Sequence, residues 1–210
     1  MSVEFGRLTP NGTLLAAMSA HSDVSGVIRA SAVVFVAALT AAAAQISIPL
    51  PFTPVPFTLQ PMVVLLGGAV LGPRLGFISQ MMYLAVGAAG LPVFAASPVL
   101  PPGVFRLIGP TGGYLLSYPI AAFVTGTLAE RGFDRRYLTS VLAMAAGLTV
   151  IFACGVMWLA FFARPAAVGI SAALQTGLYP FLPADIVKVL VAATIMPGTW
   201  RIVGNSELRT

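Results

Sequence analysis

The sequence predicts an all-α integral membrane protein: a single membrane domain over residues 1–210, with six transmembrane helices between about 27 and 201. Of its 210 residues, 58% are hydrophobic and only 8% are charged, and the mean hydropathy is +0.96. A soluble domain carries about 25% charged residues, so this chain has too little polar surface to cover a globule in water. The charges also leave long apolar gaps, as between Arg29 and Arg74, and each gap can hold one or two spans of roughly 20 residues.

The first helix is expected at about 27–48, in VIRASAVVFVAALTAAAAQISI. Its alanines form two pairs at four-residue spacing, Ala37 with Ala41 and Ala38 with Ala42. Small side chains let another helix approach closely in lipid. That second helix can belong to the same chain or to another subunit, and the spacing allows both.

A proline-rich link, PLPFTPVPF, follows the first helix, and its four prolines forbid regular helix. The second helix is predicted at about 58–72, where Gly72-Pro73 breaks it, and the third at about 74–90. Gln60 lies where the second helix leaves the link, so its side chain can reach a pocket on that face. An interhelical hydrogen bond of about 0.6 kcal/mol is the alternative role for each polar residue in or beside the spans. These residues are Gln45, Gln60, Gln80, Tyr83 and Tyr114.

The fourth helix is predicted at about 111–130, after a proline-rich loop, and it opens in GPTGGYL. The glycines of this stretch, among them Gly112, permit close backbone approach and leave amide N–H groups near a helix start, where an anionic or polar ligand is favoured. A tight turn that feeds a helix also explains the pattern. The short turn ERGFDRR precedes the fifth helix at about 137–163, and a second long connection precedes the sixth at about 183–201.

The positions of the arginines predict the orientation. Residues 1–26 are expected to be a cytoplasmic tail, because MSVEFGRLTPNG is polar and lacks the apolar core of a signal peptide. With both termini inside, the outer side holds only Arg106 and Arg164, and the cytoplasmic side holds the larger share that the positive-inside rule requires. That share is Arg7, Arg29, Arg74, Arg131, Arg135, Arg136, Arg201 and Arg209. The three long loops then lie outside, where a lid or binding pocket is expected.

Two opposite charges interrupt the beginning of the sixth helix, in FLPADIVKVLVAA. Asp185 and Lys188 are three residues apart and so share one helix face. Either charge at the centre of a bilayer costs roughly 2.5–3.5 kcal/mol, so one interpretation is that the two residues face each other and a ligand. In the other, Asp185 favours the positive end of the helix and Lys188 extends to the membrane surface.

Several functions are disfavoured by the residue content. With one histidine, His21, and one cysteine, Cys154, zinc and iron sites and a Ser-His-Asp triad have no support, so no cofactor is expected and the chain is not predicted to be an enzyme. A nucleotide-binding phosphate loop needs a lysine after glycine, whereas the only lysine follows Val187. The net charge of +5 has its explanation in the positive-inside bias, and no nucleic-acid partner is expected.

Five linked motifs resemble the BioY family, the biotin-specific substrate-binding (S) components of energy-coupling-factor (ECF) transporters. In chain order they are IPLPFTPVPFTLQ, LGPRLG, YLAVGAAGLPVFA, GPTGGYLLSYPIAA and PADIVKVLVAA. The resemblance implies an S-component-like bundle in the prokaryotic inner membrane, whose long external loops close a pocket. It also implies high-affinity capture of biotin from outside and delivery with a T component and ABC-type ATPases, so that separate subunits hydrolyse ATP.

The resemblance also implies roles for individual residues. Asp185 would accept a ureido N–H of biotin, and Lys188 would donate to the ureido oxygen or to the tail carboxylate. Tyr83, Tyr114 and Phe94 are expected to form apolar walls, and Gln60 is expected to make a further polar contact. Gly112 would allow close approach of the backbone, and Arg106 would supply a cation for the carboxylate. Ala38 and Ala42, or the register of Ala37 and Ala41, would dock on the T component.

Three other functions remain open from the sequence. The first is an S component for another vitamin, since the fold serves several. The second is a stand-alone secondary carrier driven by an ion gradient, in which Asp185 is the coupling acid. The third, a membrane enzyme, is disfavoured by the scarcity of paired nucleophiles and bases.

Overall fold

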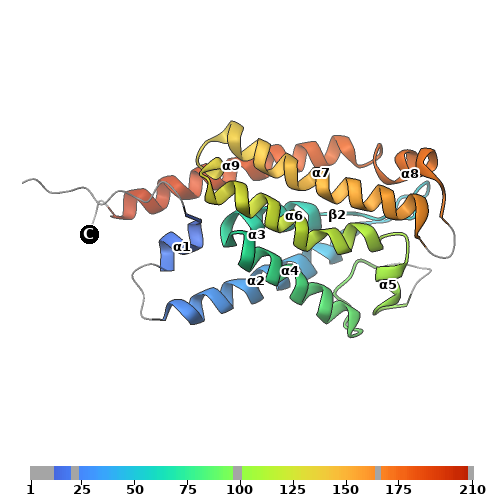
Figure 1. Ribbon diagram of the computed structural model, residues 1–210, viewed down its shortest axis with the longest axis horizontal. Coiled ribbons are helices and arrows are strands. Elements are labelled where there is room, and N and C mark those ends of the chain that lie inside the picture. The colour runs from blue at the N-terminus through green and yellow to red at the C-terminus, as the bar shows by residue number, and fades with distance from the viewer. Residues whose placement is uncertain (1–11, 20–23, 97–100, 164–166, 208–210) are drawn as a thin grey trace, which may run out of the picture.

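The computed structural model describes residues 12–19, 24–96, 101–163 and 167–207. Predictions for His21, Arg7, Arg164 and Arg209 therefore lie outside the described residues. Within the described ranges the chain forms a bundle of long helices (Figure 1). The long helices are α2 (Ser25–Gln45), α3 (Gln60–Leu71), α4 (Pro73–Ala88), α6 (Gly112–Glu130), α7 (Tyr137–Phe161) and α9 (Leu182–Glu207). Their bounds lie within three residues of the predicted ranges, except that α9 extends six residues beyond its predicted end at about 201.

Successive long helices run in opposite directions, so the bundle has two distinct ends (Figure 1). One end, which we call the hairpin end, carries a two-stranded antiparallel sheet and two short helices. These elements are β1 (Ser47–Ile48), β2 (Phe57–Thr58), α5 (Phe105–Ile108) and α8 (Ile170–Gly177). The other end, the turn end, carries α1 (Leu14–Ser19) and the 3₁₀ turn η1 (Phe133–Arg135).

The short elements correct two expectations. The chain is mostly helical, but the proline-rich link folds into a hairpin in which Ser47 pairs with Thr58. The N-terminal segment is also more than a polar tail, because α1 packs on the bundle. Leu14 and Leu15 are buried, and the hydroxyl of Thr13 accepts a hydrogen bond from the backbone N–H of Ala16 at 3.4 Å.

Glycines bring the central helices into close contact. A side chain at Gly68 of α3 would collide with the backbone of Ala122 in α6, and one at Gly126 of α6 would collide with the α3–α4 turn. Gly72 forms that turn with φ +83°, a conformation that glycine adopts without strain. The turn and the close packing set the depth at which α3 and α4 lie against α6.

The outer faces of the bundle are apolar, as a lipid environment requires. Helices α2, α7 and the Leu182–Ile202 part of α9 are each long and apolar enough to cross a membrane. Large hydrophobic side chains such as Phe35, Leu138 and Ile202 are exposed on them. The chain is therefore a multi-pass membrane protein.

Candidate ligand-binding site

Asp185 and Lys188 form a buried ion pair at the beginning of α9. The two residues are only 4% and 9% exposed. Lys188 Nζ donates to Asp185 Oδ1 at 2.6 Å and to the backbone oxygen of Thr58 at 2.6 Å. Its ammonium also lies 3.7 Å from the centre of the Phe57 ring. Lys188 thus turns inward to Asp185 and the hairpin, while Asp185 lies in the first turn of α9, as the other interpretation expects.

The hairpin is what receives the lysine. Strand β2 places Phe57 against the ammonium as a cation–π partner and presents the Thr58 carbonyl as an acceptor. A buried ion pair is favourable only when its geometry is good and its remaining polar atoms are satisfied. The contacts to Phe57 and Thr58 supply part of that second condition for the ammonium, and they join the hairpin to the start of α9.

A group of aromatic and amide side chains lies beside this unit. Gln60, the first residue of α3, donates from Nε2 to the Tyr83 hydroxyl at 2.6 Å, and that hydroxyl donates to the backbone oxygen of Val93 at 3.2 Å. The Tyr83 ring meets Phe94 edge to face at 5.4 Å and stacks with Tyr118 at 6.5 Å between centroids. Helices α4 and α6 and the segment that carries Phe94 thus form one aromatic wall, to which α3 adds the Gln60 amide.

Thr58 connects the two groups. Its hydroxyl lies 3.4 Å from Gln60 Oε1, while its carbonyl accepts from Lys188. We refer to Thr58, Gln60, Tyr83, Asp185 and Lys188 as the polar cluster. The structure therefore brings together four residues singled out in the sequence, Asp185, Lys188, Tyr83 and Gln60, through a fifth that the sequence did not indicate.

A cavity of about 190 Å³ opens next to this wall at the hairpin end. Phe94, which touches Tyr83, also lines the cavity, and so does Arg106 of α5. Arg106 is buried and donates to the backbone oxygens of Pro101 and Ala95, both at 3.1 Å. Burial lowers the pKa of the Arg106 guanidinium, but arginine stays charged in proteins, so a cation lies at the cavity wall.

Tyr114 and Gly112 make contacts on another side of α6. The Tyr114 hydroxyl donates to the backbone oxygen of Gly177 in α8 at 2.8 Å, and its ring covers Gly155 of α7. A side chain at Gly112 would collide with the carbonyl of Leu107 and the indole of Trp158. These contacts pack the start of α6 on α7 and α8.

The two alanine registers of α2 differ in exposure. Ala38 and Ala42 are exposed on the outer face of the helix, whereas Ala37 is buried and Ala41 is half-buried. Thr40, between them, is fully buried and accepts a hydrogen bond from Gln80 of α4 at 3.1 Å. The register of Ala38 and Ala42 is thus the one that another protein can reach.

Sequence reasoning missed three residues of the site. Phe57 and Thr58 contact Lys188, and Tyr118 stacks on Tyr83. The only signal for the first two was their place in the proline-rich link just before Gln60. Tyr118 lies one helical turn after Tyr114 in an apolar helix, and nothing in the sequence distinguishes which tyrosine faces the cluster.

Comparisons with known proteins agree with one another. The model of the BioY family matches residues 16–205. A probable biotin transporter BioY of Pyrococcus horikoshii is 44% identical over 176 residues, covering 84% of this chain and 96% of the relative. The biotin transporter BioY of Thermotoga maritima is 42% identical over 158 residues, covering 75% and 87%. The crystal structure of the S-component for biotin from an ECF-type ABC transporter superposes with a TM-score of 0.76 at 25% identity, covering 86% of this chain and 94% of that one.

Proposed function

The chain belongs to the BioY family, and from this premise we propose that it is the biotin-binding S component of an ECF-type importer. The observation that carries the proposal is the buried pair of Asp185 and Lys188, held against the hairpin beside an aromatic wall. Such a pair presents an acceptor and a donor of opposite charge side by side. A ligand with adjacent N–H and carbonyl groups on a small ring matches these two groups.

Biotin has the matching groups. Its ureido ring carries two N–H donors and one carbonyl acceptor. In our proposal the Asp185 carboxylate accepts a ureido N–H. Lysine has three N–H donors, and Lys188 uses two of them on Asp185 and Thr58. The third donates to the ureido oxygen or to the tail carboxylate, a charge-assisted bond that contributes roughly 1.5–3 kcal/mol.

The apolar rings and the tail need further partners. Tyr83 and Phe94 form the wall for the thiophane ring, and Gln60 holds the Tyr83 hydroxyl in place. Arg106 at the cavity wall is the cation for the tail carboxylate. Tyr114 and Gly112 act indirectly, because their contacts fix the start of α6 on α7 and α8.

The membrane arrangement follows from the same proposal. The six long helices form one bundle in the prokaryotic inner membrane, with the hairpin end outside and both termini in the cytoplasm. Ala38 and Ala42 form the docking surface for a T component, since their side chains are exposed on α2. ABC-type ATPases in the same complex hydrolyse ATP.

Isothermal titration of the detergent-purified protein with biotin tests the binding function. We expect saturable heat with biotin and none with riboflavin, thiamine or pyridoxal. Heat with another vitamin but not with biotin would refute the assignment of the ligand. Biotin uptake by cells that lack any T component and its ATPases, if a protonophore abolished it, would instead identify a stand-alone carrier.

A further inference from the structure

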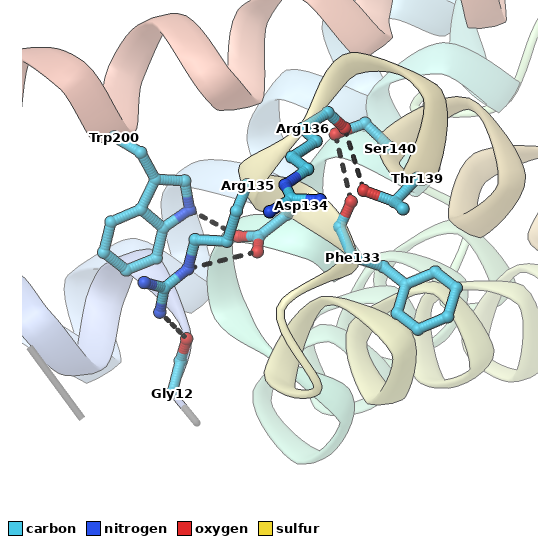
Figure 2. A network of polar contacts seen from close by, with 8 residues as sticks. All are labelled: Gly12, Phe133, Asp134, Arg135, Arg136, Thr139, Ser140 and Trp200. Atoms are coloured by element: carbon cyan, nitrogen blue, oxygen red, sulfur yellow. Dashed lines mark hydrogen bonds and ion pairs between the residues drawn. The ribbon is translucent and has the colours of Figure 1, made fainter. Parts of the chain in front are cut away.

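Helix α9 is fastened at the turn end as well as at the hairpin end. Figure 2 shows Trp200 of α9 directed at η1, where its indole Nε1 donates to Asp134 Oδ2 at 2.6 Å. The guanidinium of Arg135 lies 3.8 Å above the centre of the indole ring and donates to the backbone oxygen of Gly12 at 3.3 Å. We call Asp134, Arg135 and Trp200 the turn-end anchor.

The turn-end anchor holds a buried carboxylate at some cost. Asp134 is only 2% exposed and Trp200 is 8% exposed. Oxygen Oδ1 of Asp134 has no hydrogen-bond partner among the described residues, and the nearest cation, Arg135 Nε, is 3.7 Å away. An apolar contact at this point would be less costly, so the arrangement is unusual for packing alone. A directional bond at a fixed angle is what the carboxylate adds.

Trp200 lies on the same face of α9 as the ion pair. The buried residues of this helix recur at three- and four-residue spacing from Asp185 and Lys188 to Trp200. Those in between are apolar: Val189, Ala192, Ala193 and Met196. Hydrogen bonds are directional, so the polar contacts at the two ends constrain how α9 is turned.

Geometry shows how far such a rotation would carry. Twelve residues separate Lys188 from Trp200, which is about 18 Å along the axis at about 1.5 Å per residue. Polar side-chain atoms lie roughly 5 Å from a helix axis. A rotation of about 20° would therefore move the Lys188 ammonium by nearly 2 Å, enough to break a hydrogen bond.

We propose that Asp134 and Trp200 are positioning residues for the ligand site. Their hydrogen bond fixes the rotation and depth of α9, and with them the placement of Asp185 and Lys188 against the hairpin. Neither residue touches the ligand. The inference rests on the proposed binding function, because it concerns the site where biotin is proposed to bind.

Substitutions at the turn-end anchor test the effect on binding. Trp200→Phe keeps an aromatic ring and loses the N–H, and we expect it to weaken biotin binding three- to tenfold by titration. Asp134→Asn keeps an oxygen that accepts from the indole, so its affinity should stay within twofold. A control on the same helix is Thr194→Val, which removes an exposed hydroxyl bonded to the backbone oxygen of Val191 at 2.7 Å, and its affinity should stay within twofold. Equal affinities for folded Trp200→Phe and the unsubstituted protein would overturn the proposal.

Reciprocity provides a readout that does not require substitution of the anchor. If the anchor alters affinity for biotin, biotin must alter the anchor by the same free energy. The chain has two tryptophans, so in Trp158→Phe the emission reports Trp200 alone. Addition of biotin up to saturation should change the quenching of Trp200 emission by acrylamide. The midpoint of this change should equal the midpoint measured by calorimetry on the same variant, and no change would overturn the proposal.

A ligand-free version separates this proposal from the binding function. In the Trp158→Phe background, Lys188→Met breaks the ion pair at the far end of α9 and should also change the quenching of Trp200. If Lys188→Met leaves the quenching of Trp200 unchanged, the positioning role of Asp134 and Trp200 is refuted. Absence of biotin heat with the unsubstituted protein would refute the binding function instead, so the two failures are distinguishable.

Discussion

Replacement of Lys188 by alanine is the sharpest test of the ligand site. The change removes the hydrogen bonds to Asp185 and Thr58 and the cation–π contact with Phe57. It also removes the proposed donor to biotin. Loss of one charge-assisted bond to the ligand corresponds to roughly 1.5–3 kcal/mol. Biotin affinity should therefore fall at least tenfold, since about 1.4 kcal/mol is a factor of ten.

The same substitution also leaves a buried carboxylate without its cation. Removal of one partner from a buried pair typically costs about 3–5 kcal/mol in stability, and Asp185 is only 4% exposed. The double variant Asp185→Asn with Lys188→Met removes both charges and leaves no unpaired charge buried. Its free energy of unfolding should therefore fall less, relative to the unsubstituted protein, than that of Lys188→Ala.

Two assays on the same preparation separate these effects. Titration calorimetry in detergent gives the affinity for biotin, and thermal unfolding without ligand gives the stability. A folded Lys188→Ala protein that binds biotin as tightly as the unsubstituted one would refute the role of the ammonium in recognition. Full biotin affinity in the charge-free double variant would refute the role of both residues.

Further predictions concern the wall, the cavity, the docking surface and the turn. Tyr83→Phe keeps the ring but removes the hydroxyl that bonds to Gln60 and to the backbone oxygen of Val93, so thermal unfolding should show a loss of about 1–3 kcal/mol; no loss would contradict the role of this hydroxyl in holding the wall. Arg106→Gln should weaken binding of biotin severalfold but leave binding of biotin methyl ester unchanged, and an equal loss for both would exclude a contact to the carboxylate. Ala38→Trp should abolish co-purification with the T component at unchanged biotin affinity, whereas Ala37→Trp, at a buried position, should lower the unfolding temperature. Burial raises the pKa of Asp134 above its ordinary value of 3.8, so the folded state binds this proton more tightly than the unfolded state, and stability should fall as pH rises from the unfolded to the folded pKa. In Asp134→Asn this decrease in stability with pH should be absent. The reasoning would be contradicted if the unsubstituted protein became more stable over this pH range and Asp134→Asn removed that increase.

The sequence was sufficient for the long helices, because apolar runs between charges and glycine-proline breaks define them directly. It also indicated Asp185 and Lys188, since two charges in an apolar run are costly unless something receives them. It could not indicate that the receiver is the carbonyl of Thr58. A backbone acceptor has no signature in residue types, and the hairpin that places it forms in a link whose prolines suggested only irregular chain.

The faces of the helices were harder to predict than their positions. A helix that is apolar on all sides has no amphipathic stripe, so nothing distinguished Tyr114, which packs on α8, from Tyr118, which stacks on Tyr83. Asp134 was missed for a related reason: within ERGFDRR it looks like one more charge in a solvated turn. Its burial depends on Trp200, more than sixty residues later in the chain.

Lys188 reaches the hairpin through a main-chain oxygen. Every amino acid at position 58 carries that oxygen, so a change of side chain there leaves the acceptor of the Lys188 hydrogen bond in place. The side chain at position 58 can therefore change in size and polarity while the last helix keeps this attachment. At this bond, the choice of side chain on the hairpin and the attachment of the last helix are independent of each other.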